Sequence, residues 1–318
     1  MNRIHITTSI KNSQSIIAID VSKDSLEVLT ADQSFSSENS QRGFAALQRK
    51  ISAKPNCFVV FEATGGYERA LSDFLHACKI ALCIVNPRLV RAFAISEGIK
   101  AKTDPIDAQM IYRFAESKVL RPTPAPSPGQ RELSDLLDRR CQLSECVARE
   151  KNRIQKAHNK TVLASLRRSV KALEKEIALV ESHIQKLIER TPSMEKACKI
   201  MTSVKGVGKI TAWTILGQIP EITRVSRNEL VALAGVAPFN RDSGKQVGKR
   251  YIGGGRAKIR RVLFMAARTA SQFNPVIRPY VEGLVSRGKA YKCALTAAIR
   301  KILIHLQALL KKSEVSPC

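Results

Sequence analysis

Residues 16–20 read Ile-Ile-Ala-Ile-Asp, and this short run decides the fold expected for the first part of the chain. Four apolar residues, three of them β-branched, predict a buried strand, and the carboxylate of Asp20 follows where that strand ends. Residues 57–62, Cys-Phe-Val-Val-Phe-Glu, repeat the arrangement with Glu62 as the carboxylate. Two buried strands that each lead into an acidic residue predict a sheet with carboxylates at one edge.

The segments around these strands predict a mixed α/β sheet that is covered by helices. A strand over residues 26–30 follows the first one after a short turn, which favours a hairpin, and another strand occupies residues 81–85. Asn-Pro at residues 86–87 is expected to stop that strand. Helices are expected over residues 43–51, 67–78 and 104–117. The alternation of strands and helices is typical of an α/β domain.

A proline-rich segment divides the chain. Residues 121–129 read Arg-Pro-Thr-Pro-Ala-Pro-Ser-Pro-Gly, and neither a helix nor a central strand can pass through four alternating prolines. The sequence therefore predicts an α/β domain over residues 1–120, a linker over 121–130, long helices over 131–192 and a mostly helical domain over 193–318.

The long helical segment contains a heptad pattern. Its apolar residues are spaced alternately three and four positions apart: Leu163, Leu166, Val170, Leu173, Ile177, Val180, Ile184 and Leu187. This spacing is typical of a coiled coil, formed within the chain or between chains. The alternative is a single amphipathic helix that packs on its own domain. Pro192 is expected to end the helix, and several shorter helices follow.

Positive charge is concentrated in the second part of the chain. The sequence has 53 Lys and Arg against 27 Asp and Glu, a net charge of +26, of which residues 1–120 carry +3 and residues 121–318 carry +23. An excess of this size repels itself unless a polyanion neutralises it. Nucleic acid is therefore the first partner to consider.

Other features favour a cytoplasmic, nucleoid-associated protein over a membrane or secreted one. Apolar runs such as residues 57–61 are far shorter than the roughly 20 residues that span a bilayer, and residues 1–15 contain no apolar segment of signal-peptide length. The eight cysteines form no CxxC pair, so reduced thiols are expected. Trp213, the only tryptophan, lies in an apolar helical pattern and is expected in the core.

Four carboxylates form the first candidate site. Asp20 and Glu62 follow buried strands, and Asp104 and Asp107 lie three residues apart on one helix face. Converging oxygen ligands suit Mg²⁺ or Mn²⁺, the cations that paired-metal sites use to cut phosphodiesters. Alternatively, Asp104 is the N-cap of its helix with Asp107 in a capping box, while Asp20 and Glu62 are surface turn residues.

The second candidate site is a Gly-x-Gly turn between two apolar helical segments. Residues 204–211 read Val-Lys-Gly-Val-Gly-Lys-Ile-Thr. Gly206 and Gly208 let backbone N–H groups at a helix N-terminus approach a phosphate, and Lys205 and Lys209 add positive charge. The turn resembles a helix-hairpin-helix element, which binds the DNA backbone. An ordinary helix end followed by a tight turn is the alternative.

The third candidate site is a basic, glycine-rich stretch that begins with Asn-Arg-Asp-Ser-Gly-Lys at residues 240–245. Ser243 lies among cations that would stabilise the charge developing on a phosphoryl group under nucleophilic attack. The alternative is a solvated phosphate-binding loop in which Ser243 only caps a turn, and no general base is identifiable by spacing. The basic residues of this stretch are Arg241, Lys245, Lys249, Arg250, Arg256, Lys258, Arg260 and Arg261.

Taken together, the motifs resemble the DEDD transposase family of insertion sequences, the Piv-related group that includes bridge-RNA-guided serine recombinases. The first three matching stretches read Ala-Ile-Asp-Val-Ser-Lys, Phe-Glu-Ala-Thr-Gly-Gly-Tyr and Lys-Thr-Asp-Pro-Ile-Asp-Ala, at residues 18–23, 61–67 and 102–108. Gly-Val-Ala-Pro at residues 235–238 and Asp-Ser-Gly at 242–244 follow in register. No acidic position and no serine departs from the pattern.

The resemblance implies a RuvC-like domain of the RNase H type, whose Asp20, Glu62, Asp104 and Asp107 bind Mg²⁺. It also implies a transposase domain in which Ser243 attacks the DNA backbone and becomes covalently attached to the cut end. Donor DNA and target DNA are the implied partners. Family members assemble as homodimers that pair into tetramers, partly through the coiled coil, and the quartet of one subunit meets the serine of another. In several members a non-coding bridge RNA pairs with both DNAs.

The basic part of the chain fits this division of roles. It has few aromatic residues for stacking and no compact recognition-helix signature, which suits a protein that contacts nucleic-acid backbones and leaves sequence reading to base pairing.

The leading hypothesis is a Mg²⁺-dependent DNA transposase or site-specific recombinase with Ser243 as nucleophile. One rival is a junction-resolving nuclease, in which the carboxylates activate water and Ser243 is structural. The other is a non-catalytic nucleic-acid-binding scaffold, whose function would survive loss of the carboxylates.

Overall fold

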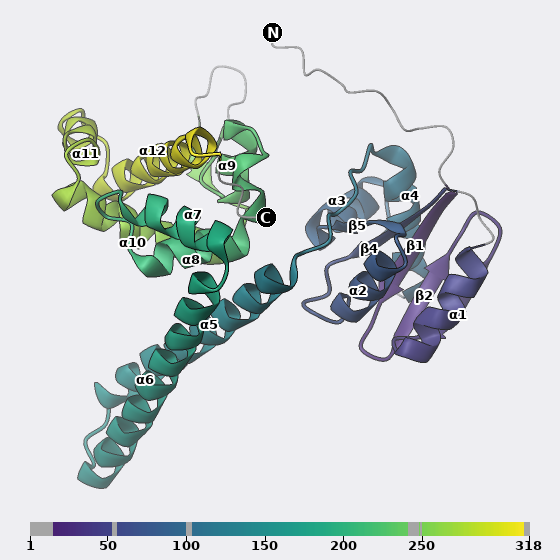
Figure 1. The fold of residues 1–318 in the computed structure, drawn as a ribbon, viewed down its shortest axis with the longest axis horizontal. Coiled ribbons are helices and arrows are strands. Elements are labelled where there is room, and N and C mark those ends of the chain that lie inside the picture. Colours follow the sequence, from purple (N-terminus) through teal and green to yellow (C-terminus); the bar gives the residue numbers. More distant parts are fainter. Residues whose placement is uncertain (1–14, 53–55, 100–103, 241–247, 249, 315–318) are drawn as a thin grey trace. The chain divides into compact units, whose positions relative to one another are not determined.

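The chain divides into two compact units, and the division falls inside the proline-rich segment. The computed structural model describes residues 15–52, 56–99, 104–240, 248 and 250–314 (Figure 1). The first unit ends at Ala125 and the second begins at Pro126.

A five-stranded mixed sheet forms the centre of the first unit (Figure 1). Its strands are β1 (Ser15–Val21), β2 (Ser25–Leu29), β3 (Ser34–Glu38), β4 (Cys57–Glu62) and β5 (Ala81–Val85). The order across the sheet is β3-β2-β1-β4-β5, with β1–β2 and β2–β3 antiparallel and β1–β4 and β4–β5 parallel. The predicted mixed sheet and hairpin are confirmed.

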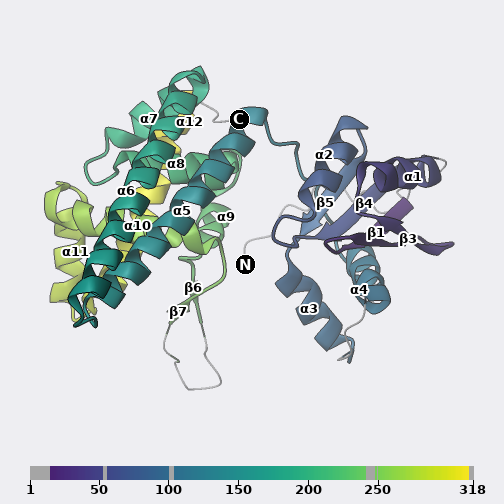
Figure 2. The same cartoon turned by 90° about the horizontal axis from the view of Figure 1, so that it is seen from below.

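Helices cover both faces of this sheet, as Figure 2 shows. They are α1 (Gln41–Ile51), α2 (Arg69–Ala77), α3 (Pro87–Ser96) and α4 (Asp104–Ser117). Side chains alternate between the faces of a strand. Ile17 and Ile19 of β1 therefore pack in a core with α1 and α2, whereas Ala18 packs in a second core with α3 and α4.

Two of these elements were not predicted from the sequence. β3 reads Ser-Phe-Ser-Ser-Glu and lies at the sheet edge, and three of its four polar residues, Ser34, Ser36 and Glu38, are exposed. α3 begins where only the end of a strand was expected. The Asn86 side chain accepts a hydrogen bond from the Arg88 N–H at 2.9 Å, and Pro87 occupies the first helical turn.

The residues after Leu120 hydrogen-bond to the sheet before the chain leaves the first unit. The N–H of Thr123 donates to the Leu82 carbonyl at 2.7 Å, and its hydroxyl accepts from the N–H of Ile84 at 3.0 Å. Both partners lie on β5, the last strand of the sheet. These bonds satisfy backbone groups at a sheet edge that would otherwise be open to another strand.

The second unit is mostly helical, as predicted. Its helices are α5 (Pro128–Ile154), α6 (Lys160–Glu189), α7 (Pro192–Thr202), α8 (Lys209–Gln218), α9 (Arg227–Leu233), α10 (Ala257–Phe273), α11 (Ile277–Ser286) and α12 (Tyr291–Lys312), with a 3₁₀ turn η1 (Pro220–Thr223) and a short ribbon of β6 (Pro238–Phe239) and β7 (Tyr251–Ile252). Trp213 is only 3% exposed, which confirms its expected place in the core.

The apolar character of α12 is explained by its place in this unit. Among the described residues, α12 is the one helix long and apolar enough to cross a membrane by length and composition. It packs against α7, α9, α10 and α11, and its buried side chains, such as Leu295, Ile299 and Leu303, belong to the main core of the unit.

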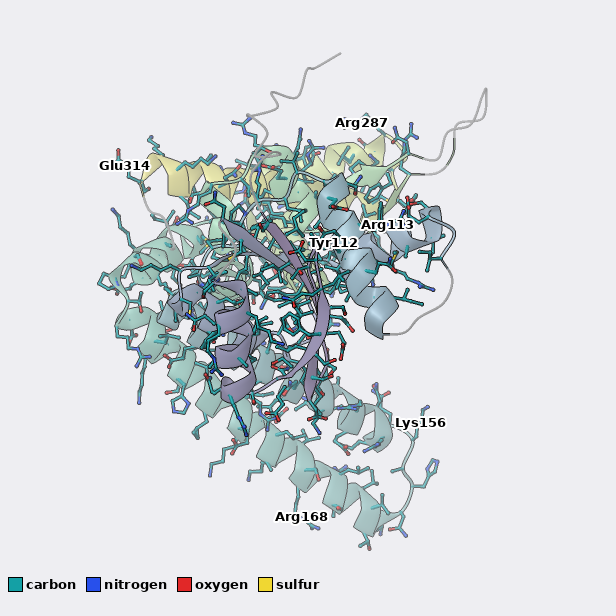
Figure 3. All side chains as sticks on the ribbon, turned by 90° about the vertical axis from the view of Figure 1, so that its right-hand side faces the viewer. Tyr112, Arg113, Lys156, Arg168, Arg287 and Glu314 are labelled. Carbon is teal, nitrogen blue, oxygen red and sulfur yellow. The ribbon has the colours of Figure 1, made fainter. Side chains whose placement is uncertain are left out.

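The heptad residues of α6 pack against α5 of the same chain. The two helices form a long hairpin that extends from the rest of the unit (Figure 1), and Figure 3 labels Lys156 and Arg168 near its free end. Val170, Ile184 and Leu187 are buried, and the other heptad residues are partly buried. Of the interpretations left open by the sequence, the structure shows the intramolecular helix pair.

A polar pair lies within this helical hairpin. Arg140 of α5 donates from Nε to Glu181 Oε1 of α6 at 2.7 Å, and the two side chains are only 23% and 33% exposed. A charged pair of this kind holds two helices in one register, because a slip would leave both charges without a partner.

Candidate active site

The strand register brings Asp20 and Glu62 to one face of the sheet. β1 and β4 are parallel neighbours, with Ala18 paired to Val60 and Ile19 paired to Phe61. Asp20 follows Ala18 by two positions and Glu62 follows Val60 by two, so both carboxylates share the face of Ala18 and Val60. Both side chains are partly buried. The sequence predicted that both carboxylates lie at one edge of the sheet, and the pairing of β1 with β4 shows that they also share one face.

Helix α4 covers that same face. Met110 and Ile111 pack in one core with Ala18 and Val60, and α4 contacts β1, β2 and β4. Asp107 precedes Met110 by three residues and Ile111 by four, so it lies on the sheet-facing side of α4, one turn earlier. Figure 3 labels the following residues of this helix, Tyr112 and Arg113.

A further carboxylate lies in the same row of the sheet and was missed from the sequence. Glu27 of β2 is paired directly with Asp20 of β1, so the two side chains point to the same face. The Ser36 hydroxyl of β3 donates to Glu27, at 2.7 Å from each carboxylate oxygen. The alternation of residues in Ser25–Leu29 could have indicated this position from the sequence. Leu26 and Val28 are buried on one face of the sheet, so Glu27 between them points to the other.

The donor chemistry of this face suits a hard cation, but the described side chains do not close a cage around one. Asp20, Glu62 and Asp107 offer oxygen ligands, which Mg²⁺ and Mn²⁺ prefer. Among the side chains that the structure describes, no group of three or more His, Cys, Asp or Glu residues is placed to hold a metal ion. Asp104 is the first residue of α4, and its side chain lies outside the described set.

The loop after Glu62 is held by the side chain of Glu68. Glu68 Oε2 accepts hydrogen bonds from the Thr64 N–H at 3.1 Å, the Thr64 hydroxyl at 2.7 Å and the Gly66 N–H at 2.8 Å. Partial burial alone would raise the pKa of Glu68, but the hydrogen bonds from Thr64 and Gly66 outweigh it, so the pKa lies below its ordinary value. Gly65 and Gly66 adopt positive φ angles of 80° and 133°, which glycine tolerates.

Asn39 links this loop to the loop that follows Asp20. Its side-chain amide donates to the Ser22 carbonyl at 2.8 Å and to the Tyr67 carbonyl at 3.2 Å. Ser22 lies two residues after Asp20, and Tyr67 lies five residues after Glu62. The backbone segments that follow two of the candidate ligands are therefore tied through one side chain.

In the second unit, the Gly-x-Gly turn joins α7 to α8 as a helix–turn–helix hairpin. Gly206 has a φ of +99°, and a Cβ there would lie 2.6 Å from the Cβ of Ala270 on α10. The Asn274 side chain fixes the turn by donating to the Lys205 carbonyl at 2.9 Å. Gly206 is therefore required by close packing.

Gly208 of the same turn has a different role. It is the N-cap of α8, has an ordinary φ of −85°, and has no neighbour within 4 Å of a built Cβ. Lys205 and Lys209, on either side, are exposed. The N-terminus of α8 is thus open to solvent at Gly208, which is the arrangement expected of a backbone phosphate contact.

The predicted nucleophile lies outside the described residues. Ser243 belongs to the segment between β6 and β7, and so do four of the predicted cations. Arg241, Lys245 and Lys249 lie outside the described residues as well, whereas Arg250 is described and exposed. Asn240 and Arg250 are the described residues at the two ends of this segment, and next to them Phe239 pairs with Tyr251 at the end of the β6–β7 ribbon.

Four of the other predicted cations bind groups of the second unit itself. Arg256 pairs with Glu221 and donates to the Gln218 carbonyl, and Arg260 donates to the Gly254 carbonyl at 2.8 Å. These contacts fasten the glycine-rich stretch after β7 to the end of α8, to η1 and to its own backbone.

The remaining two of the four cations bind helix α5. Lys258 pairs with Asp138 at 2.6 Å and Arg261 with Glu145 at 2.8 Å, and the hydrogen bond from Arg261 lowers the pKa of Glu145. Lys258 is 47% and Arg261 65% exposed, so both remain within reach of an anion. The pairing with α5 could not be read from local sequence, because the partners lie more than a hundred residues earlier.

Comparison with known proteins matches both units of the chain to transposases. A family model of DEDD transposases, described as "Transposase", matches residues 17–162, and a second, described as "Transposase IS116/IS110/IS902 family", matches residues 198–282. The two together cover more than two thirds of the chain.

Curated relatives agree with these family models. The chain is 27% identical over 313 residues to the "Pilin gene-inverting protein" of Moraxella lacunata, covering 95% of this chain and 97% of the relative. The protein of the same name from Moraxella bovis is 26% identical over the same length. The "Insertion element IS900 uncharacterized 42 kDa protein" of Mycobacterium paratuberculosis is 28% identical over 162 residues, which cover 49% of this chain and 39% of that protein.

The chain has a mixed α/β unit with carboxylates on one sheet face, followed by a basic helical unit. Both units match proteins that rearrange DNA, so the chain is a DNA recombinase. Within that class, the chain belongs to the IS116/IS110/IS902 family of transposases.

Proposed function

We propose that this transposase cuts and rejoins DNA through a covalent intermediate on Ser243, supported by Mg²⁺ at the carboxylates of the first unit. The observation that carries the proposal is the end-to-end similarity to a protein whose name states that it inverts a gene. Inversion requires strands to be cut and rejoined, and a covalent enzyme–DNA bond conserves the energy for rejoining.

The proposed step exchanges one phosphate ester bond for another and needs no co-reactant besides the bound cation. The Ser243 oxygen bonds to phosphorus as it loses its proton, the bond from phosphorus to one deoxyribose oxygen breaks, and that oxygen leaves as a protonated hydroxyl. Attack by a hydroxyl of the partner strand reverses the exchange. Cations in residues 241–261 would stabilise the charge that develops on the phosphoryl oxygens.

The carboxylates would hold the cation at the sheet. Asp20, Glu62 and Asp107 lie on facing surfaces of the sheet and α4, and Asp104 begins the same helix. When bound, Mg²⁺ would supply Lewis-acid polarisation of the scissile phosphate. The strand order, with two antiparallel pairs beside two parallel pairs, supports a RuvC-like fold of the RNase H type for this unit.

The proposal extends to partners. The resemblance supports assembly of homodimers into tetramers, in which Ser243 of one copy meets the carboxylates of another, and a bridge RNA that pairs with donor and target DNA. The net charge of +23 in residues 121–318 supports binding to more than one nucleic-acid strand. Sequencing the nucleic acid that co-purifies with the full chain tests the RNA, because a guided enzyme retains one discrete short RNA and an unguided one retains random fragments.

The decisive experiment traps the protein–DNA adduct under denaturing conditions. We expect a denaturant-resistant adduct with wild type and its loss in Ser243→Ala, with retention in Ser286→Ala, an exposed serine on α11. Asp20→Asn should abolish cleavage in Mg²⁺. An undiminished adduct in Ser243→Ala would refute the nucleophile, and hydrolysed ends without any adduct would instead support a junction-resolving nuclease.

A further inference from the structure

Two aromatic rings lie exposed at the base of the segment that contains Ser243. Phe239 of β6 and Tyr251 of β7 are paired directly across the ribbon, with ring centroids 5.5 Å apart and ring planes inclined by 28°. Phe239 is 46% and Tyr251 45% exposed. A stacked aromatic pair with nearly half of its surface in water can still cover apolar area on another molecule.

The core of the second unit does not account for these rings. Of the described residues, Val236 is buried in that core and Ala237 packs against it, but the chain leaves the core at Pro238. Both strands of the ribbon are exposed along their length. The aromatic pair therefore stands outside the core of packed helices.

The surroundings of the pair are complementary to a nucleic-acid backbone. Arg250 precedes Tyr251 and is exposed, and further cations follow in the same stretch of chain. Gly253 and Gly254 have no neighbours within 4 Å of a built Cβ, so a phosphate can approach the backbone closely beside the rings. Aromatic faces flanked by cations and open backbone are the elements from which single-strand sites are built.

We propose that Phe239 and Tyr251 form a stacking platform for one unstacked base of the DNA strand that is cut. Stacking accepts any base, so the platform would fix the strand beside the reacting phosphate without reading its sequence. This inference rests on the proposed function in one respect: it assumes that the DNA strand must reach Ser243. The platform would use two of the few aromatic residues that the sequence shows in the basic part.

Cross-strand contact that merely stabilises the ribbon is the competing role for the pair. A ribbon of two residues per strand is marginal alone, and aromatic pairs do stabilise such pairings. Leucine at either position keeps apolar contact across the ribbon but removes the flat π-face. Phe239→Leu and Tyr251→Leu therefore separate stacking on a base from support of the ribbon, and Tyr251→Phe keeps both.

The test uses full-length protein and a single-stranded DNA oligonucleotide that contains one 2-aminopurine, whose fluorescence falls when it stacks. We expect quenching and tight binding with wild type and Tyr251→Phe, and binding weakened by about 10-fold, with quenching lost, in either leucine variant. An abasic oligonucleotide of the same length should bind all four proteins equally. Phe273→Leu, at a 67% exposed phenylalanine on α10, should behave as wild type.

Several results would overturn the platform. Leucine variants that quench and bind as wild type would do so, as would an equal loss of affinity for the abasic strand, which would indicate a disturbed ribbon. A preference for RNA of the same sequence would refute the assignment to DNA. Quenching in Ser243→Ala should be intact, so failure of the serine as nucleophile and failure of the platform give different outcomes.

Discussion

Replacing Glu68 with alanine tests how the loop after Glu62 keeps its shape. In the wild type a single carboxylate oxygen accepts two backbone N–H groups and one hydroxyl from Thr64 and Gly66. Glu68→Ala leaves all three donors to water. Because the loop passes through two glycines with positive φ, it has many alternative conformations once that acceptor is gone.

The size of the effect follows from the contacts. A hydrogen bond to a charged group contributes about 1.5–3 kcal/mol when buried, and about 1 kcal/mol is appropriate here because Glu68 is partly exposed. The two backbone bonds then stabilise the closed loop by about 2 kcal/mol, which is about a 30-fold change in the opening equilibrium.

Hydrogen–deuterium exchange on the full chain measures that equilibrium directly. The amides of Thr64 and Gly66 should exchange about 30-fold faster in Glu68→Ala, while those of β5 keep their wild-type rate. Glu68→Gln retains one acceptor oxygen and should lie between the two. Exchange in Glu68→Ala within about twofold of wild type would show that the carboxylate does not order the loop.

The same carboxylate contributes a pH dependence of known sign. Since the folded-state pKa of Glu68 is lowered, its contribution is present at neutral pH and is lost as the pH falls below the ordinary carboxyl range and through the folded pKa. The acid limb of the stability curve should therefore be shallower in Glu68→Ala than in wild type.

Three further predictions concern the second unit. Gly206→Ala forces a Cβ against α10 at a positive φ, so it should lower the free energy of unfolding of this unit by about 3 kcal/mol. Gly208→Ala has open space around the added Cβ and should change that free energy by less than about 1 kcal/mol. Urea unfolding, followed by the fluorescence of the single tryptophan, measures both. Arg140→Ala and Glu181→Ala, combined in a double-mutant cycle, should show a coupling of about 1 kcal/mol, and a coupling of zero would mean that the pair does not hold the helical hairpin in register. DNA affinity should fall by at least about 100-fold between about 50 and 200 mM salt, and a flat salt profile would contradict backbone binding.

The parts of the fold that could be predicted are those with a local signal. The β-branched run that ends in a carboxylate correctly predicted β1 and the position of Asp20. The alternation of buried strands with helices correctly predicted the α/β class. In contrast, β3 is a strand because β2 offers it a partner, and its own residues are mostly polar. α3 was missed because Asn86-Pro87 ends a strand as readily as it begins a helix, and burial of its apolar face decides between them.

The candidate site divides in the same way. Asp20, Glu62 and Asp107 could be found because each follows a recognisable element, but their common face depends on strand pairing. Glu27 enters that row only through the register of β1 with β2. The acceptor role of Glu68 depends on a tight loop conformation, for which sequence spacing alone offers no signal.

The hydrogen bonds of Thr123 to β5 have a consequence for the reach of one unit from the other. Because Thr123 is fixed to the sheet and Ser127 is the N-cap of α5, only residues 124–126 join the two units freely. Three residues span at most about 11 Å. Each inserted residue lengthens this tether by at most about 3.5 Å, so the insertion length at which recombination fails would measure how closely the two units of one chain must be coupled for the reaction.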